Sequence, residues 1–254
     1  PFVFGTPAVC DGIAMGHKGM RYSLISREVI SDCCEVMVEG HAMDGWVGVS
    51  NCDKVTPGML MAAGRMNIPA LMVTGGAMEA GKLNGEDIDF QSVFEAIGQV
   101  QVGAADESFL KTVECAACPG AGSCSGLFTA NTMACLTETL GMSLTGCGTS
   151  LAVDEKKLAI AKESGKRIVE LVKKGIKPRD IVNSHSFHNA ICVDMAIGGS
   201  TNTALHIPAI SKEFGCPVDL SEFDKISREV PHITSLRPAG QFHIRDLDNA
   251  GGVP

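Results

Sequence analysis

The feature that most constrains the fold is an apolar run that stops at a cluster of reactive side chains. The run is Trp46–Val49, and Cys52, Asp53 and Lys54 follow it closely. A strand that ends at such a cluster presents it at the carboxyl edge of a sheet, where α/β proteins bind ligands. Cysteine suits a soft metal or an iron–sulfur cluster, whereas aspartate suits a hard cation such as Mg²⁺. Because neighbouring side chains of a strand point in opposite directions, this segment can serve two inorganic centres.

Strands and helices are expected to alternate around this cluster. A helical period runs over Ser26–Glu39, and a second helix is expected over Met59–Met66, opened by Pro57. Ala70–Thr74 is the next apolar run and predicts another buried strand. Near-continuous apolar strands separated by helices indicate an α/β fold with a parallel sheet that is covered on both faces.

The rest of the chain is predicted to be largely helical. The apolar start, Phe2–Val9, predicts a strand, Cys115–Gly126 is a loop rich in glycine and cysteine, and the chain from Asp219 onward is predicted to be irregular. Further helices are expected over Asp89–Glu114, Leu127–Leu140, Leu158–Lys174, His185–Ile197 and Thr203–Phe214. The helix over Leu158–Lys174 has a clear amphipathic pattern, and its charged face is interpreted as solvated surface.

Charge and cysteine content narrow the class of protein. The net charge of −8, without a basic cluster, argues against a nucleic-acid-binding surface. No apolar run reaches the length of a membrane span. The eleven cysteines are odd in number and include the adjacent Cys33 and Cys34, which favours a reducing compartment over a disulfide framework. Both ends look cut, so we expect residues 1–254 to form one domain of a longer protein.

Two cysteines are candidate iron–sulfur ligands. Cys52 follows the strand, and Cys124 lies in a glycine-rich segment whose backbone amides can approach a sulfur atom closely. The alternative is a glycine-rich turn around an inert thiol, because two cysteines do not complete a four-thiolate site. Cys115 and Cys118 form a Cys-x-x-Cys pair and suggest zinc, but no second pair completes a zinc ribbon.

Asp11 and Asp53 are candidate Mg²⁺ ligands. Both follow apolar segments and both stand next to a cysteine, so two carboxylates are expected to converge from adjacent strand ends. The alternative is that each aspartate caps the helix that follows it. Lys54 is unusual beside a cation: it either binds an anionic substrate or is neutral, and a neutral lysine can be carbamylated by CO₂ to give an oxygen ligand.

A third candidate site is the segment Gly198–Asn202, which resembles a cradle for phosphate or carboxylate at a helix start but lacks a P-loop lysine. His17 is a further candidate because its loop follows Asp11. The substrate-binding candidates are therefore His17, Ser200, Thr201 and Asn202. Three other histidines, His185, His188 and His206, are interpreted as hydrogen-bonded core residues.

Taken together, five segments resemble the dihydroxy-acid and sugar-acid dehydratase family. They are Asp11–His17, Tyr22–Glu28, Cys52–Ala62, Cys118–Met133 and Gly198–Asn202. The resemblance follows the family's order through essentially the whole chain. It implies a three-layer α/β/α sandwich with a mostly parallel sheet, which forms the N-terminal, iron–sulfur- and Mg²⁺-binding domain of a two-domain enzyme. The family's C-terminal β-barrel-like domain is expected outside this sequence.

The resemblance also implies cofactors and ligands. It implies a [2Fe–2S] cluster, with [4Fe–4S] as the alternative, held by three cysteines. Two of these match Cys52 and Cys124, and the third belongs upstream of Pro1. It implies Mg²⁺ bound by Asp11, Asp53 and a carbamylated Lys54. No catalytic residue is expected within this chain, because the family's serine base and a glutamate ligand belong to its C-terminal part.

The implied activity is removal of water from a 2,3-dihydroxy acid to give a 2-keto acid, as in valine and isoleucine biosynthesis. Aldonate or 6-phosphogluconate dehydration is the alternative within the family. A non-catalytic cluster-binding module that uses Cys115 and Cys118 is the alternative outside it. A small-molecule substrate and a homodimer are expected, with no nucleic-acid or membrane partner. The expected location is the cytoplasm, or an organelle stroma or matrix in a eukaryote. The chain alone is expected to be inactive.

Overall fold

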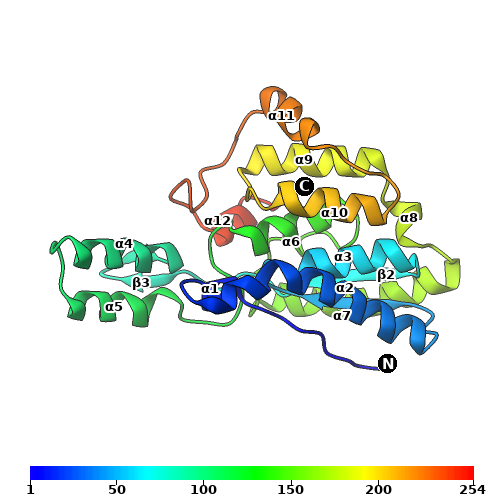
Figure 1. The fold of residues 1–254 in the computed structure, drawn as a ribbon, viewed down its shortest axis with the longest axis horizontal. Helices are drawn as coiled ribbons and strands as arrows, with labels where there is room; N and C mark the ends of the chain where they lie inside the picture. Colours follow the sequence, from blue (N-terminus) through cyan, green and yellow to red (C-terminus); the bar gives the residue numbers. More distant parts are fainter.

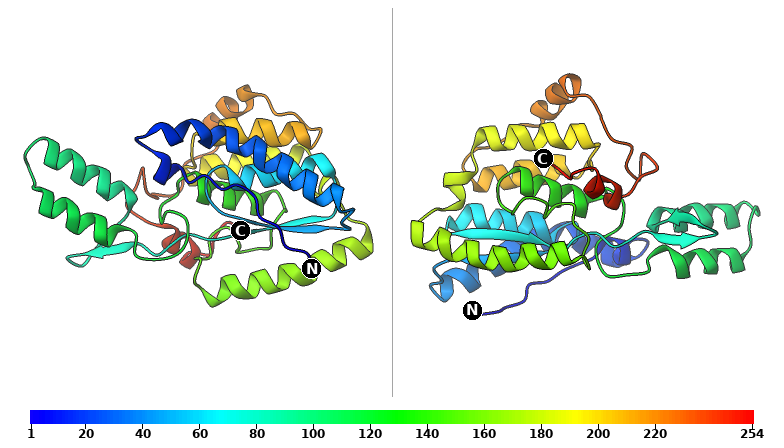
Figure 2. Two further views of the ribbon diagram at one scale, coloured as in Figure 1. Left: turned by 60° about the horizontal axis from the view of Figure 1, so that its bottom comes forward. Right: turned by 180° about the vertical axis from the view of Figure 1, so that it is seen from behind.

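A small parallel sheet lies at the centre of the molecule, in a computed structural model that describes residues 1–254. Strand β1 (Trp46–Ser50) pairs with β2 (Ala70–Thr74). Helix α3 (Val55–Met66) connects the strands on one face, and α7 (Glu155–Lys174) covers the other face (Figures 1 and 2). These three layers confirm the predicted α/β fold, with a parallel sheet of two strands.

Helix α3 is the central helix, and every residue from 55 to 64 is buried. A helix that is apolar on all sides needs neighbours on all sides. It begins at Val55, four residues before the predicted start, because Pro57 sits in the first turn, where a missing N–H leaves no bond unmade. It ends at Asn67, which adopts a left-handed φ of 52° and is followed closely by Pro69.

Four helices surround α3 and complete the core. Helices α2 (Ser23–Gly40), α6 (Thr129–Thr139) and α10 (Thr203–Glu213) contact it, and α9 (Ser184–Ile197) packs against α6. All four confirm predicted helices, of which α2 was predicted from its apolar period. The largest wholly buried side chains of this core include Ile30, Leu60, Met72, Leu136 and Phe187.

A helical arm projects from one side of the molecule (Figure 1). It consists of the antiparallel strands β3 (Gly81–Leu83) and β4 (Glu86–Ile88) with helices α4 (Phe90–Gln101) and α5 (Glu107–Ala117). The prediction of one helix over Asp89–Glu114 was wrong. The chain turns at residue 103, a glycine with φ of 74°, and the carboxylate of residue 106 caps a new helix.

Two further predictions need correction. Phe2–Val9 is extended but pairs with no strand, since a strand needs a neighbour for its backbone bonds. The chain after Asp219 is not irregular throughout, because α11 (Leu220–Glu229) begins there, capped by the Asp219 carboxylate. Half of its residues are charged, and Ile226 is its one buried residue, so the sequence gives only a weak apolar signal. The remaining short helices are α1 (Asp11–Ala14), η1 (Lys18–Tyr22), α8 (Pro178–Ile181) and α12 (Ile244–Asn249).

None of these helices combines the length and the apolar character that crossing a membrane requires.

Candidate active site

The candidate site begins at a sharp turn at the carboxyl end of β1. Cys52 adopts a left-handed φ of 75°, a conformation that non-glycine residues rarely take. Its backbone N–H is held by the side chain of Asn51 at 3.1 Å. The turn places Asp53 and Lys54 at the start of α3, where both are buried. Backbone strain of this kind concentrates at functional sites, so the turn supports the prediction that this segment is functional.

Two carboxylates converge on the ammonium of Lys54. Its Nζ atom lies 2.8 Å from Oδ2 of Asp11 and 2.8 Å from Oδ2 of Asp53. Asp11 comes from the first turn of α1, and its Oδ1 accepts a 2.6 Å hydrogen bond from the hydroxyl of Ser23. The three charged side chains are at most 15% exposed. Two negative charges and one positive charge therefore share a largely dry volume, which leaves one negative charge uncompensated.

Neither carboxylate acts as a helix cap, the alternative considered from the sequence. The cap residue of α3 is Lys54 and that of α1 is Cys10, and neither accepts a side-chain capping bond. The carboxylates of Asp11 and Asp53 face Lys54 instead.

Asp53 has two further partners, both from the region around α10. The side-chain amide of Asn202 donates to its Oδ2 at 3.1 Å, and Nε2 of His206 lies 3.3 Å from its Oδ1. Burial raises the pKa of the Asp53 carboxyl, but the hydrogen bonds from His206 and Lys54 outweigh burial and hold the pKa below its usual value. Asp53 is therefore ionised at neutral pH, as a cation ligand must be.

Part of the predicted cradle belongs to the hydrogen-bond network around Asp53. The amide of Asn202 also donates to the hydroxyl of Thr129 at 3.1 Å, which in turn lies 2.8 Å from the hydroxyl of Ser200. Thr201 is exposed and its side chain makes none of these bonds. Asn202 is thus bonded to Asp53 directly and Ser200 is linked to it through Thr129, whereas the side chain of Thr201 is exposed to solvent.

His17 does not join the carboxylates. Its Nε2 bonds to the carbonyl of Ile13 at 2.9 Å, and its Nδ1 accepts from the backbone N–H of Gly19 at 2.9 Å. The ring is exposed, and both of its nitrogens form hydrogen bonds within its own loop. A role for His17 in substrate binding stays a prediction.

Cys52 and Cys124 lie in one neighbourhood, and both are half-buried. Burial raises the pKa of both thiols, that of Cys124 to about 12, and the nearby Cys118, Cys10 and Cys52 raise it further. The structure therefore brings four thiols to the same edge of the sheet as the carboxylates. With their pKa values raised, the thiols of Cys52 and Cys124 are protonated at neutral pH.

A glycine-rich loop holds Cys124 in place. Gly122 has a φ of 135°, and a Cβ atom there would stand 2.4 Å from the backbone nitrogen of Met78. The adjacent Ser123 exchanges backbone hydrogen bonds with Gly76 and Met78, at 2.9 and 2.8 Å, which extends β2 toward this loop. Gly122 therefore allows two backbone segments to pack closely, and this packing fixes the position of the Cys124 thiol.

The donor set fits Mg²⁺ better than it fits a complete iron–sulfur site. Mg²⁺ is commonly bound by one or two carboxylates together with water and substrate, and Asp11 and Asp53 supply two carboxylates. No group of three His, Cys, Asp or Glu side chains is arranged to hold a metal ion by itself. Cys52 and Cys124 fit as two ligands of a cluster whose other ligands lie elsewhere.

The site roles of two residues of this network were missed from the sequence. His206 is a buried, hydrogen-bonded histidine as predicted, but its contact with Asp53 was not predicted, and no site role was assigned to Arg27, which lies 3.2 Å from its Nδ1. The available signal was spacing: His206 follows Asn202 by four residues, which places the two on one face of α10.

His185 and His188 were predicted to be core histidines as well; that prediction was wrong, because both are exposed.

Fold and site together define an α/β protein that presents two carboxylates around one lysine, and a group of thiols, at one edge of a parallel sheet. All 254 residues match the family described as dihydroxy-acid/6-phosphogluconate dehydratase N-terminal. The chain belongs to this family.

Named relatives agree with the family match. The chain is 59% identical to a dihydroxy-acid dehydratase of Endomicrobium trichonymphae, 57% identical to one of Halothermothrix orenii and 58% identical to one of Methanosarcina barkeri. Each match covers 100% of this chain and 46% of the relative. The chain thus spans about half the length of these relatives.

Proposed function

We propose that these residues supply the cation-binding half of a dehydratase that converts 2,3-dihydroxy carboxylic acids into 2-keto acids. The observation that carries the proposal is the convergence of Asp11, Asp53 and Lys54 at 2.8 Å, beside the thiols of Cys52 and Cys124, in a chain of the dehydratase family. The remaining ligands and the serine base would come from parts of the enzyme outside these residues, so the 254-residue chain alone would be inactive.

The reaction sets the demands on the site. A base removes the C2 proton, the electron pair of that C–H bond forms the C2=C3 double bond, and the C3 hydroxyl gains a proton and leaves as water. The enol then tautomerises to the 2-keto acid. When bound, Mg²⁺ would polarise the substrate carboxylate and C2 oxygen, and an iron–sulfur cluster, [2Fe–2S] or [4Fe–4S], would act as a Lewis acid toward the leaving hydroxyl.

The chain's own residues would prepare this chemistry. Asp11 and Asp53 offer ionised oxygens from fixed positions, which avoids reorganisation when charge develops on the substrate. Carbamylation of the Lys54 amine by CO₂ releases a proton and replaces a repelling ammonium with an anionic oxygen ligand. Thr201, exposed beside the fixed Asn202, would contact polar groups of the substrate.

A branched 2,3-dihydroxy acid is the favoured substrate, since the similar proteins named above are all called dihydroxy-acid dehydratases. The test is to incubate the full-length protein with 2,3-dihydroxyisovalerate, gluconate and 6-phosphogluconate and to measure the 2-keto acid formed. We expect the first to react fastest and Asp53→Asn to abolish turnover. Faster turnover of a sugar acid would favour the alternative substrate class. Turnover by the isolated 254 residues would overturn the proposed division of the site.

Compartment and assembly are also proposed. All eleven cysteines are free, which supports a reducing compartment such as the cytoplasm. A homodimer is proposed from the family resemblance alone. Light scattering on the purified full-length protein tests it, and a monomeric mass would contradict it.

A further inference from the structure

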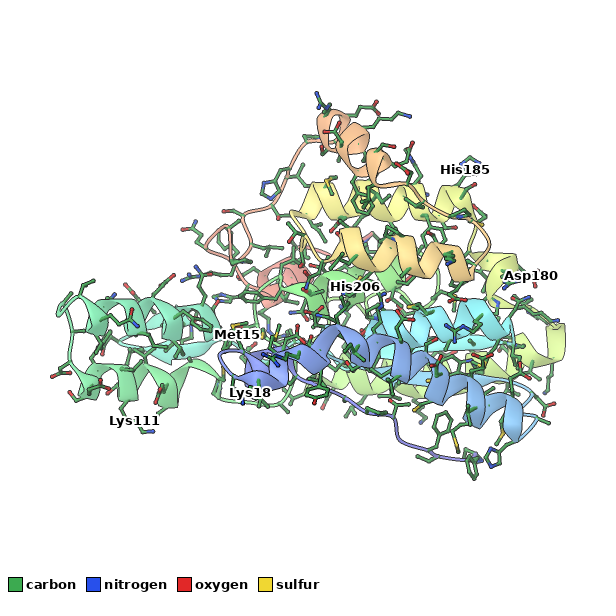
Figure 3. All side chains as sticks on the ribbon, viewed as in Figure 1. Met15, Lys18, Lys111, Asp180, His185 and His206 are labelled. Atoms are coloured by element: carbon green, nitrogen blue, oxygen red, sulfur yellow. The ribbon has the colours of Figure 1, made fainter.

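We propose that His206 and Arg27 are positioning residues that fix the orientation of the Asp53 carboxylate for a divalent cation. This inference rests on the proposed function, because it presumes that Asp53 is a cation ligand. His206 is wholly buried and lies on α10, beside α2 (Figure 3). Its two ring nitrogens face the two other residues: Nε2 lies 3.3 Å from Oδ1 of Asp53, and Nδ1 lies 3.2 Å from Nη1 of Arg27.

Arg27 fixes the tautomer of the His206 ring. A guanidinium group only donates hydrogen bonds, so Nδ1 of His206 must accept. In a neutral imidazole the other nitrogen then carries the proton, and Nε2–H donates to Asp53. The alternative tautomer would direct an N–H at the guanidinium and a lone pair at the carboxylate, which is unfavourable at both ends.

Arg27 is itself held in place on both sides. Its Nη1 also donates to the backbone carbonyl of Leu205 at 3.0 Å, which ties the guanidinium to the residue before His206. Its Nε and Nη2 donate to Oε1 of Glu28 at 3.1 and 2.7 Å. The Arg27 side chain is only 12% exposed, and its charge is paired with that of Glu28. The guanidinium therefore has little freedom to leave the ring nitrogen.

The arrangement suits a cation site because it orients a carboxylate without adding a positive charge next to it. The neutral ring of His206 engages Oδ1 of Asp53, and Asn202 and Lys54 engage Oδ2. A lysine or arginine in the place of His206 would form the same bond but would repel a divalent ion. Outer hydrogen bonds of this kind orient ligands, and their loss commonly costs about 10- to 100-fold in metal affinity.

The test is the affinity of the full-length protein for Mn²⁺, a hard-cation probe whose sharp electron paramagnetic resonance signal is lost on binding. We expect His206→Leu and Arg27→Met to weaken Mn²⁺ binding by about 10- to 100-fold. His206→Gln keeps a neutral donor at similar reach and should stay within about threefold of the wild type. The matched control is His185→Leu, because His185 is exposed at the start of α9 (Figure 3). This variant should bind Mn²⁺ as tightly as the wild type does.

Asp53→Asn separates the two levels of the proposal. If Asp53→Asn binds Mn²⁺ as tightly as the wild type, the cation site itself is wrong and the proposed function fails. If Asp53→Asn loses Mn²⁺ while His206→Leu and Arg27→Met bind normally, only the positioning role is overturned. If His206→Leu does not fold, the Mn²⁺ affinity of Arg27→Met tests the positioning role instead: weaker binding supports the role, and wild-type binding overturns it.

Discussion

The Nζ atom of Lys54 lies 2.8 Å from Oδ2 of Asp11, although 43 residues separate the two in sequence. The backbone brings them together because α1 follows the N-terminal extended segment and lies beside the carboxyl end of β1. Asp53 shares the same ammonium. Lys54 therefore neutralises part of the charge of two buried carboxylates.

Replacing Lys54 with methionine should destabilise the metal-free chain by about 3 kcal/mol, because removing one partner of a buried ion pair leaves an uncompensated charge. The Lys54 side chain is only 6% exposed, so water cannot compensate for the loss. The free energy of unfolding in urea and EDTA measures the effect. Addition of Mg²⁺ should restore part of the stability in Lys54→Met, because a divalent ion supplies the missing positive charge.

The matched control is Lys111→Met, on the projecting arm (Figure 3). The Lys111 side chain is 74% exposed and its ion pair with Glu114 is 3.6 Å long, so its loss should cost less than about 0.5 kcal/mol. Equal losses in the two variants would mean that the convergence on Lys54 does not stabilise the chain.

Asp194 should make stability depend on pH. Burial raises the pKa of its carboxyl from 3.8 to about 6, and a hydrogen bond from Thr203 only partly opposes this. Thr203 Oγ1 lies 2.6 Å from Oδ2 of Asp194 and 2.8 Å from the carbonyl of Ser200. The Thr203 hydroxyl has one proton for these two acceptors, and Oδ1 of Asp194 has no hydrogen-bond partner, so hydrogen bonds compensate the buried carboxylate poorly.

Because the folded chain holds this proton more tightly than the unfolded chain, the stability contributed by Asp194 is full below pH 3.8 and is lost as pH rises through about 6. The loss amounts to about 3 kcal/mol at 1.36 kcal/mol per pKa unit. Asp194→Asn cannot ionise and should gain that much relative to the wild type between pH 3.5 and 7, values that bracket the two pKa values. A constant difference between the two proteins across this range would contradict the assignment.

Gly122→Ala should destabilise the loop that carries Cys124. The substitution combines an unfavourable φ of 135° with a Cβ placed 2.4 Å from the nitrogen of Met78. The expected loss is at least about 2 kcal/mol in the free energy of unfolding, with faster reaction of Cys124 toward a thiol reagent. Gly120→Ala, where nothing lies within 4 Å of the added atom, is the control and should stay near wild type. Similar behaviour of the two variants would show that the close approach of the two backbones is unimportant.

The sequence predicted the parts of the fold that depend on local pattern. Strands β1 and β2 and helices α6, α7, α9 and α10 follow from apolar periodicity, because each buries a continuous apolar stretch or face. The split between α4 and α5 was missed because both halves share a helical pattern. The strand predicted over Phe2–Val9 was wrong, because an apolar run does not reveal whether a partner strand lies beside it.

The site was predictable only in part, for a similar reason. Asp11 and Asp53 were singled out because each stands next to a cysteine after an apolar segment, and Lys54 because it follows Asp53; the structure brings the three together. His206 was correctly predicted to be a hydrogen-bonded core histidine, but the sequence did not identify its partner Asp53, 153 residues away. Only the tertiary packing of α10 against the start of α3 brings His206 to Asp53.

We expect Cys52 and Cys124 to hold an iron–sulfur cluster beside Asp53 in a dehydratase. The most direct measurement is the iron and sulfide content and the visible absorbance of the anaerobically purified full-length protein, with Cys52→Ser, Cys124→Ser and the control Cys115→Ser, an exposed thiol on α5. We expect the wild type and Cys115→Ser to contain a cluster. Cys52→Ser and Cys124→Ser should lose the cluster and, with the cluster, the dehydration of 2,3-dihydroxyisovalerate. An intact cluster in Cys52→Ser or Cys124→Ser would contradict the account and move the thiolate site to other cysteines.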